Sequence, residues 1–257
     1  MKVSNQDMAM RETARLPRLS TESGRYHYVI PDYETHPDPY SRTWILLDWV
    51  GTGKRVLELG CSTGCMSQYM TQKRNCSVTG VEVDCAAAEQ AAKFCGEVLV
   101  RNLDRPDWIS GLRKSKFDVV LMGDVLEHLV APRELLVQTR ELLDAEATAV
   151  ICLPNVVHWI TRLKILFGRF DYESAGTLDH THLRFYTVKT ARELIESAGY
   201  RITRFHPAFG GRLSGYARPI WQWLARWFPG IFAIQLLYEA KPQDGNSQVP
   251  SVKGGEL

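Results

Sequence analysis

One short segment of the chain gathers four side chains that can accept, donate or stabilise a proton. Asp179, His180, His182 and Arg184 lie within six residues of one another in the stretch 176–187. Histidine titrates near neutral pH and is the side chain most often used as a general base. We therefore predict that His182 acts as a base or orients an acceptor. His180 is a further catalytic candidate, and Asp179 and Arg184 are candidate substrate-binding residues.

The same segment also contains the beginning of a metal-binding pattern. Asp179-His180-x-His182 offers potential ligands close together in the chain. A catalytic zinc site needs three protein ligands, and a structural zinc site needs four. Because no third and fourth ligand follow at a suitable spacing, the sequence predicts no metal.

A second group of polar residues follows the apolar run Phe117-Asp-Val-Val-Leu-Met-Gly123. Asp124, Glu127 and His128 come directly after this run, where they would lie at the carboxyl end of a strand. His128 is a candidate catalytic group that faces an acceptor. The alternative is that Glu127 and His128 hold the following loop and shape a ligand pocket, because a single histidine is more often a structural hydrogen bonder than a base.

Residues Glu58 to Gly64, Glu-Leu-Gly-Cys-Ser-Thr-Gly, form a glycine-containing turn at the end of an apolar run. Doubly wound proteins bind nucleotides at such a turn. The dinucleotide fingerprint would need glycines at 60, 62 and 65, but Ser62 and Cys65 occupy two of these positions. No Gly-Lys-Ser/Thr follows either, so the turn predicts a nucleoside ligand without phosphates.

Glu82 stands 22 positions after Gly60, at the end of a second apolar run. In doubly wound proteins, a carboxylate about 20 residues beyond the glycine turn binds ribose hydroxyls. Taken alone, Glu82 would be a solvated residue at a strand end. Its spacing from the glycine turn favours ribose binding.

The apolar pattern predicts the elements that position these residues. Short apolar runs alternate with helical patterns, which is typical of a parallel sheet with helices on both faces. The expected strands are 55–60, 77–83, 97–100, 117–123, 147–154, 200–207 and 232–241. The expected helices are 44–50, 67–73, 85–94, 132–143 and 188–198, the last of which ends at Gly199. The sequence therefore predicts an α/β fold.

Three motifs together resemble the class I S-adenosylmethionine-dependent methyltransferases. They are Glu58 to Gly64, Gly80-Val-Glu82, and Phe117 to His128, and the resemblance extends over roughly residues 26–241. It implies a Rossmann-like, doubly wound sheet of seven mostly parallel strands whose last strand is antiparallel. It also implies S-adenosylmethionine as the cofactor.

The resemblance implies which residues contact this cofactor. The glycine turn would hold the methionine part, Glu82 the ribose, and Asp124 would approach the methionine end. Asn102 takes the place where the family usually has an acidic residue near the adenine amine, with Asp104 two positions on. The implied cofactor-binding residues are Glu58, Gly60, Cys61, Ser62, Gly64, Glu82, Val83, Asn102, Leu103 and Asp124.

A narrower resemblance concerns the acceptor. Leu153-Pro-Asn-Val-Val-His158, the Gly176 to Phe185 element and the arm Tyr26-x-Tyr28 are similar to one branch of the family. Its members accompany bacterial polysaccharide, glycolipid and other small-molecule pathways and look related to the ubiquinone-type O-methyltransferases. The resemblance implies O-methylation of a hydroxyl on a small metabolite, sugar or glycolipid, with Tyr28 among the substrate-binding residues.

Two rival functions stay open. The first is a cofactor-binding partner or regulatory protein without transferase activity. The second is an enzyme that methylates nitrogen or takes nucleic acid as its acceptor, although the sequence lacks the Asn/Asp-Pro-Pro-aromatic tetrad that amine methylases use. Nucleic acid is not expected as a partner, because the formal net charge is only +2.

Residues 200–228 contain five arginines and neither Asp nor Glu. Within 216–228, the apolar side chains have helical spacing, and polar side chains lie on the other side of the expected helix. The apolar stripe is Ile220, Trp223, Leu224, Trp227 and Phe228. The polar side is Arg218, Gln222 and Arg226. The pattern predicts a helix that packs its stripe on the domain and covers the acceptor pocket. The alternative is peripheral contact with a membrane surface or a lipid-linked acceptor.

The composition is that of an ordinary globular chain. Of 257 residues, 45% are hydrophobic and 23% charged, which excludes a fibrous or wholly disordered protein. We predict a methyltransferase domain over 25–241 between flexible tails, 1–24 and 242–257. The domain includes an N-terminal arm (25–54) and acceptor-side insertions (155–187 and 208–230).

The cysteine pattern and hydropathy bear on location. Six cysteines without paired C-x-x-C spacing predict reduced thiols used as small core residues. No run of 18 apolar residues occurs, so no membrane-spanning segment is expected. The predicted location is cytoplasmic, with the inner face of the membrane as the place of any peripheral contact.

Overall fold

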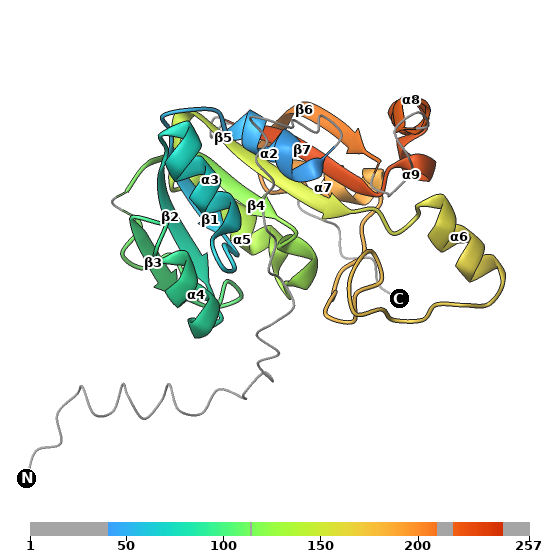
Figure 1. Cartoon of the computed structure of the whole chain (residues 1–257), viewed down its shortest axis with the longest axis horizontal. Coiled ribbons are helices and arrows are strands. Elements are labelled where there is room, and N and C mark those ends of the chain that lie inside the picture. Colours follow the sequence, from blue (N-terminus) through green and yellow to red (C-terminus); the bar gives the residue numbers. More distant parts are fainter. Residues whose placement is uncertain (1–40, 114, 210–217, 244–257) are drawn as a thin grey trace, which may run out of the picture.

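The computed structural model describes residues 41–113, 115–209 and 218–243. Seven strands form a sheet with the order β3-β2-β1-β4-β5-β7-β6 (Figure 1). Their bounds are β1 Arg55–Leu59, β2 Ser77–Glu82, β3 Glu97–Val100, β4 Phe117–Gly123, β5 Leu143–Pro154, β6 Tyr200–Ala208 and β7 Gln235–Pro242. Strands β1 to β5 pair in parallel, and β7 lies antiparallel between β5 and β6. The predicted seven-stranded sheet with an antiparallel last strand is confirmed.

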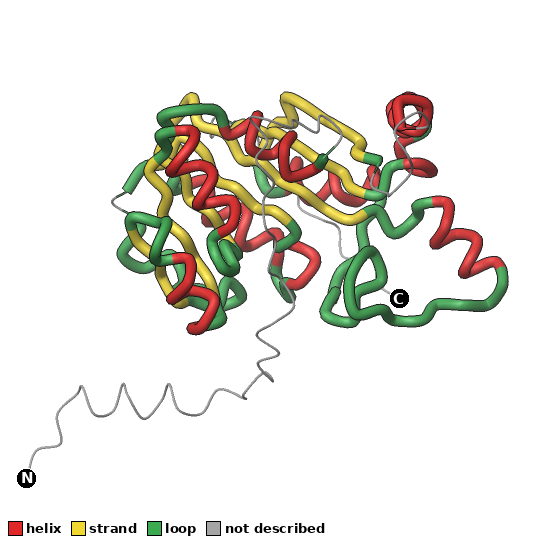
Figure 2. The backbone as a smooth tube through the Cα atoms, in the orientation of Figure 1, coloured by secondary structure: helices red, strands yellow, loops and turns green. Residues whose placement is uncertain are grey.

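Helices cover both faces of the sheet (Figure 2). Along β4, Val119 and Leu121 pack with α2 and α3, whereas Val120 and Met122 pack in a second core with α5 and α7. Because successive side chains of a strand point to opposite faces, the continuous apolar run of β4 fills both cores. The helix bounds are α2 Arg42–Val50, α3 Cys65–Arg74, α4 Cys85–Ala91, η1 Leu126–His128, α5 Pro132–Arg140, α6 Trp159–Leu166, α7 Val188–Ser197, α8 Arg218–Trp227 and α9 Pro229–Phe232.

Helix α7 begins and ends as its sequence predicts. The Thr187 hydroxyl accepts a hydrogen bond from the Thr190 backbone N–H, and the Thr190 hydroxyl accepts one from the Thr187 N–H. Gly199 follows the helix with φ of +83°, the left-handed conformation that glycine adopts at helix ends.

Several predicted boundaries are wrong. The helix expected over 132–143 ends at Arg140, and β5 begins at Leu143 rather than at 147. The reason is pairing with β4, because the Phe117 N–H donates to the Leu142 carbonyl and Phe117 lies opposite Leu143. The strand expected over 232–241 begins at Gln235, because the short helix α9 ends at Phe232.

The prediction for α8 is right about the helix and wrong about the face that packs. Ile220, Trp223, Trp227 and Phe228 are 62%, 57%, 65% and 53% exposed. Four of the five residues of the predicted apolar stripe therefore face solvent instead of the domain, whereas Leu224 is half-buried.

The opposite side of α8 holds it on the sheet. The Trp221 ring stacks on Phe209, with centroids 5.4 Å apart, and on Trp159, with centroids 6.2 Å apart. The Gln222 side chain accepts a hydrogen bond from the Phe209 N–H at 3.1 Å and donates one to the Pro207 carbonyl at 2.8 Å. Gln222 thus satisfies backbone groups where β6 ends, so this polar residue faces inward.

Helices α6, α8 and α9 lie at one end of the molecule (Figure 1). The Arg162 guanidinium of α6 donates to the Gly230 carbonyl of α9 at 3.2 Å. Of the segments predicted around the domain, the tail 1–24, Tyr28 and most of the arm lie outside the described residues, as does the tail from 244 onward. No helix in the described ranges is long and apolar enough to cross a membrane.

The six cysteines differ in burial. Cys61, Cys76 and Cys152 are buried, in agreement with their predicted use as small core residues, whereas Cys85 is exposed.

Candidate functional site

The glycine turn between β1 and α3 is built from residues in the left-handed conformation. Gly60, Ser62 and Gly64 have φ of +67°, +49° and +81°. A Cβ atom on Gly60 would lie 2.8 Å from the Val125 side chain, and one on Gly64 would lie 2.7 Å from the Ala91 Cα. Both glycines are therefore required by conformation and by space. The turn lies directly against the loop that follows β4.

Glu82, at the end of β2, is oriented by three backbone N–H groups. Its Oε2 accepts a hydrogen bond from Ser62 N at 2.8 Å, and its Oε1 accepts from Val83 N at 2.8 Å and Asp84 N at 3.0 Å. A carboxylate oxygen can accept more than one hydrogen bond. Glu82 is therefore held beside the glycine turn with capacity left for the two hydroxyls of a ribose.

Glu58 and Cys61 support the turn from the interior. Both side chains are buried, and the Ser67 hydroxyl donates a hydrogen bond to Glu58. Burial raises the pKa of Glu58 to about 8. The Cys61 sulfur fills the space that a side chain on Gly80 would need, 2.7 Å from that Cβ position. These two residues thus shape the turn by packing.

The end of β3 places the predicted adenine contacts next to Glu82. Asn102 is exposed, and its side-chain oxygen accepts from Asp104 N at 2.9 Å; Leu103 packs on the core. Asp104 Oδ1 accepts from Val130 N at 2.9 Å and Ala131 N at 3.2 Å, so this carboxylate fastens the loop after η1. Val83, directly after Glu82, is 53% exposed.

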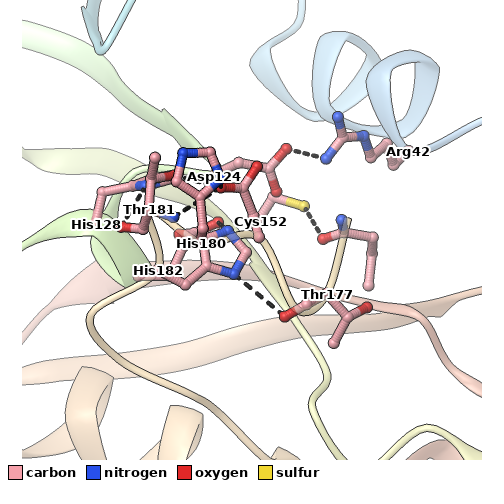
Figure 3. Close-up of polar contacts among 11 residues, drawn as sticks. Arg42, Asp124, His128, Cys152, Thr177, His180, Thr181 and His182 are labelled. Atoms are coloured by element: carbon pink, nitrogen blue, oxygen red, sulfur yellow. Dashed lines mark hydrogen bonds and ion pairs between the residues drawn. The ribbon is translucent and has the colours of Figure 1, made fainter. Parts of the chain in front are cut away.

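Asp124 follows β4 in a strained backbone conformation, with φ of +57°. Its carboxylate forms an ion pair with Arg42 of α2, and its N–H donates to the Cys152 carbonyl at 3.3 Å (Figure 3). The sequence analysis did not identify Arg42. No motif surrounds it, and only the fold brings α2 beside the end of β4.

The segment 176–187 folds back onto the loop after β4. The Leu183 and Arg184 N–H groups donate to the Glu127 carbonyl at 2.8 and 3.0 Å, and the Arg184 guanidinium donates to the Val130 carbonyl at 2.7 Å. Two regions that were separate candidates in the sequence are thereby joined. Arg184 thus stabilises the contact between the segment 176–187 and the loop after β4.

Glu127, His128 and His182 form one cluster at the junction. His182 Nε2 lies 4.0 Å from Glu127 Oε1, and the two imidazole centroids are 4.8 Å apart. Glu127 and His182 are nearly inaccessible, with side-chain exposures of 1% and 7%. Burial raises the pKa of Glu127 to about 8 and lowers the pKa of both histidines, so the imidazoles are held neutral near pH 7.

Hydrogen bonds to one segment fix both imidazole rings. His128 Nδ1 lies 3.3 Å from the Thr181 carbonyl and 3.1 Å from its hydroxyl, and His182 Nδ1 lies 3.2 Å from the Thr177 carbonyl (Figure 3). A carbonyl oxygen only accepts, so Nδ1 carries the proton in each neutral ring. The Nε2 atom of each ring therefore bears the free lone pair.

His180 and Asp179 have other surroundings. The His180 side chain is 48% exposed, and its Nδ1 lies 3.3 Å from the Glu173 carbonyl. Asp179 is buried and accepts hydrogen bonds from the Thr181 N–H and hydroxyl at 2.8 and 2.7 Å. The Asp179-His180-x-His182 pattern is thus divided, because His182 joins Glu127 and His128 while His180 does not.

Two buried polar residues beside the cluster were missed in the sequence analysis. The Tyr186 hydroxyl and the Asn155 Oδ1 are buried without a hydrogen-bond partner among the described residues. The two residues pair through their backbones where β5 ends, and the Asn155 amide donates to the Ala233 carbonyl at 2.8 Å. The sequence signal that could have identified them is their position inside two motifs, Leu153 to His158 and the segment 176–187.

Comparison with known proteins identifies the family. The model of a family described as a methyltransferase domain matches residues 37–204. This range includes the glycine turn, Glu82 and the Glu127–His128–His182 cluster.

The chain is similar to two curated proteins at low identity. It is 32% identical over 105 residues to a mitochondrial ubiquinone biosynthesis O-methyltransferase of Schizosaccharomyces pombe, covering 39% of this chain and 38% of that protein. It is 27% identical over 159 residues to a probable RNA methyltransferase of Arabidopsis thaliana, covering 52% of this chain and 48% of that protein. The chain therefore spans less than half the length of each.

Solved structures share the fold. One is the magnesium protoporphyrin IX methyltransferase of Synechocystis with bound S-adenosylhomocysteine (SAH), with a TM-score of 0.55 and 16% identity over 79% of this chain and 83% of that one. At this identity the likeness concerns the fold alone.

Proposed function

Because the chain belongs to the methyltransferase-domain family and uses S-adenosylmethionine, we propose that it methylates a hydroxyl group of a small metabolite, sugar or glycolipid. One observation carries this proposal. Two neutral imidazoles and a buried carboxyl group converge at the carboxyl edge of the sheet, on the loop that contacts the glycine turn. Such a set of groups suits an acceptor that must lose a proton.

The residues that would hold the cofactor fit its chemistry. Glu82 would accept hydrogen bonds from the ribose, and the turn from Gly60 to Gly64 would hold the methionine part. Asn102, at the end of β3, would lie at the adenine. The close approach that Gly60 and Gly64 permit, and the fixed carboxylate of Glu82, support this assignment.

The reaction sets the task of the acceptor side. When bound, S-adenosylmethionine supplies a methyl carbon on a sulfonium sulfur. A lone pair of the acceptor oxygen forms the new C–O bond while the C–S bond breaks, the sulfur keeps that bond's electron pair, and the hydroxyl proton leaves. In this proposal, His182 and His128 orient the oxygen or receive the proton. His180 points elsewhere and is not part of the proposal.

Methyl transfer to a panel of acceptors tests the function. We expect labelled methyl groups to pass from the cofactor to phenols, polyols or sugars. His182→Gln should lower kcat at least about 100-fold while SAH binding persists, because positioned acid–base groups contribute about 10²–10⁴-fold. Val137→Ser, at an exposed position on α5, is the control. Methylation of amines or RNA alone would contradict O-methylation, and SAH binding without turnover would favour a non-catalytic partner.

We further propose that the end of the molecule formed by α6, α8 and α9 contacts an anionic membrane surface, where a lipid-linked acceptor would be presented. The exposed apolar surface includes Ile160, Leu163 and Leu166 of α6 with Phe167 directly after it, and Ile220, Trp223 and Trp227 of α8 with Phe228 directly after it. Exposed aromatic side chains beside basic ones are typical of interfacial helices.

The charges around the exposed apolar surface support an anionic occupant. Residues 155–170 and 200–238 contain no Asp or Glu, and Arg162 and Arg226 lie on α6 and α8. The acidic residues that follow α6 are paired, Asp171 with Arg169 and Glu173 with Lys164. Anionic head groups would therefore face basic side chains at the edge of the exposed apolar surface.

Vesicle co-sedimentation tests the contact. We expect binding to phosphatidylglycerol vesicles and weaker binding to phosphatidylcholine vesicles. Trp223→Ser with Trp227→Ser should abolish it, whereas Val137→Ser should not. If the double variant binds vesicles as well as the wild type does, the two tryptophans do not contact the membrane. If the wild type does not bind vesicles and forms a dimer in analytical ultracentrifugation, a second copy of the chain covers this surface instead.

A further inference from the structure

We propose that Glu127, His128 and His182 bind a divalent first-row transition-metal ion that holds the acceptor hydroxyl. The potential ligand atoms of these residues all lie within 4.8 Å of one another. They come from two segments, since Glu127 and His128 belong to η1 and His182 to the stretch 176–187. Backbone hydrogen bonds from Leu183 and Arg184 to Glu127 hold the segments together. The metal's role toward the acceptor rests on the proposed function, whereas the binding site does not.

The Glu127 carboxyl group points independently to a ligand. Its side chain is 1% exposed, and neither oxygen has a hydrogen-bond partner among the described residues. His182 Nε2 lies 4.0 Å from Glu127 Oε1. A buried carboxyl group without a donor is costly, and such groups are almost always hydrogen-bonded or bound to metal. A cation between Glu127 and the imidazoles would satisfy this carboxylate.

The two histidines are oriented as metal ligands usually are. In metal sites, a ligating imidazole commonly donates its other ring N–H to a carbonyl, which fixes the ring and its tautomer. Here the Nδ1 atoms of His128 and His182 face the carbonyls of Thr181 and Thr177. Each ring is therefore left with Nε2 as the atom able to bind a metal.

The distances suit an ion after a small contraction. Ligands bound at about 2.0–2.2 Å lie at most about 4.4 Å apart across the ion. The 4.0 Å separation of His182 and Glu127 already meets this limit. Other ligand pairs lie within 4.8 Å and need shifts of only a few tenths of an ångström.

The ligand types select the class of ion. Two imidazoles and one carboxylate suit Zn²⁺, Fe²⁺, Co²⁺ and Mn²⁺, whereas Mg²⁺ prefers oxygen ligands. Three protein ligands leave at least one coordination position open for an exogenous oxygen. An acceptor hydroxyl is such a ligand.

Coordination would assist the transfer by weakening the O–H bond of the acceptor. An oxygen bound to a divalent ion loses its proton more readily than a free hydroxyl. The proton passes to water, the oxygen forms the C–O bond, and the sulfur of the cofactor leaves as a neutral thioether. The ion keeps its oxidation state throughout. Of the two roles proposed for the histidines, they then orient the acceptor oxygen through the ion, and water instead of an imidazole receives the proton.

Metal binding itself is measured first, on the full chain without a histidine tag and after chelator treatment. We expect one equivalent of Co²⁺ to bind with the visible absorption of a site containing nitrogen ligands, and Zn²⁺ to displace it. Glu127→Gln and His182→Gln should weaken Co²⁺ binding at least about 100-fold while SAH still binds. His180→Gln is the matched control and should bind Co²⁺ as the wild type does. Absence of stoichiometric binding, or unchanged binding in Glu127→Gln, would overturn the site.

Methyl transfer then tests the role of the ion. We expect turnover to fall at least about 100-fold after metal removal and to return with Zn²⁺, Mn²⁺ or Co²⁺, while SAH affinity stays constant. Undiminished turnover in the metal-free protein would overturn the metal's role and leave the proposed function standing. Stoichiometric metal binding without turnover on any hydroxyl acceptor would instead support the site and contradict the proposed function.

Discussion

Glu58 carries its carboxyl group in the protein interior beside the glycine turn. Its side chain is 1% exposed and receives a hydrogen bond from Ser67. Burial raises its pKa from 4.5 to about 8. The family resemblance implies a contact between Glu58 and the cofactor, whereas its surroundings indicate that the side chain supports the turn.

The buried Glu58 should make stability depend on pH. Between about pH 4.5 and 8 the folded protein keeps a proton on Glu58 that the unfolded chain has lost. Wild-type stability therefore falls as pH rises through this window, by at most about 1.4 kcal/mol per pH unit for one group. Glu58→Gln stays neutral, so its stability relative to the wild type should increase from pH 5 to pH 8.

Urea unfolding at four pH values between 5 and 8 measures this difference. Glu89→Gln, at an exposed position on α4, should show a difference that does not change with pH. A pH-independent difference for Glu58→Gln as well would mean that Glu58 is ionised in the folded protein.

At the scale of elements, the β1–α3 turn depends on its contact with α4. Gly64 precedes α3 with φ of +81°, and the space for a Cβ atom is occupied by the backbone of Ala91 and by Phe94. The turn, α3 and α4 therefore form one tightly packed unit. Gly111 has a similar φ of +87° but no atom within 4 Å of its Cβ position.

Alanine substitutions at these two glycines separate backbone strain from crowding. Both variants should lose about 1–2 kcal/mol from the left-handed conformation. Gly64→Ala should lose about 1–3 kcal/mol more, because the added methyl group meets the α4 backbone. Urea unfolding measures both changes, and an equal loss in the two variants would show that α4 moves away without cost.

At the scale of the whole molecule, the sheet brings the ends of β1, β2, β3 and β4 to one edge. The glycine turn, Asn102 and Asp124 follow β1, β3 and β4 in the chain, Glu82 ends β2, and all four lie along this edge. The parallel pairing of these strands aligns their carboxyl ends, so a ligand at this edge contacts several elements at once. Binding should therefore stabilise the fold as a whole.

Thermal unfolding with SAH tests this coupling. At 100 times Kd, a ligand that binds only the folded state adds about 2.7 kcal/mol, which corresponds to a rise in Tm of about 5–10 °C for a domain of this size. The same SAH concentration should shift Glu82→Ala much less, because the ribose contact is lost, and should shift Glu89→Ala like the wild type. An identical shift in all three proteins would contradict the role of Glu82.

The local sequence was sufficient to predict most of the fold. The apolar runs of β1 to β4 and the capped ends of α7 carry their signals within a few residues, so their positions are confirmed. Boundaries set by pairing with distant strands were not predictable in this way. The start of β5 at Leu143 depends on its position opposite Phe117, and nothing near Leu143 in the chain indicates that pairing.

The orientation of α8 shows a further limit of periodicity. Helical spacing correctly predicted the helix, and the apolar stripe was assigned to the core because that is the commonest arrangement. The hydrogen-bonding needs of the backbone at Pro207 and Phe209 place Gln222 inward instead, and the ring of Trp221 stacks on Phe209. The stripe is exposed as a result.

The sequence by itself determined the fold class, the cofactor and the two segments that contain the proposed acceptor-side residues, because strand periodicity and the three motifs are local patterns. Only the tertiary structure decided which residues of the two segments meet. His180 and His182 are two positions apart in the chain and have different surroundings, whereas His182 and Glu127 are 55 positions apart and lie 4.0 Å from each other. The physical reason is that the segment 176–187 satisfies its backbone N–H groups on the Glu127 carbonyl, a contact that no spacing in the sequence encodes.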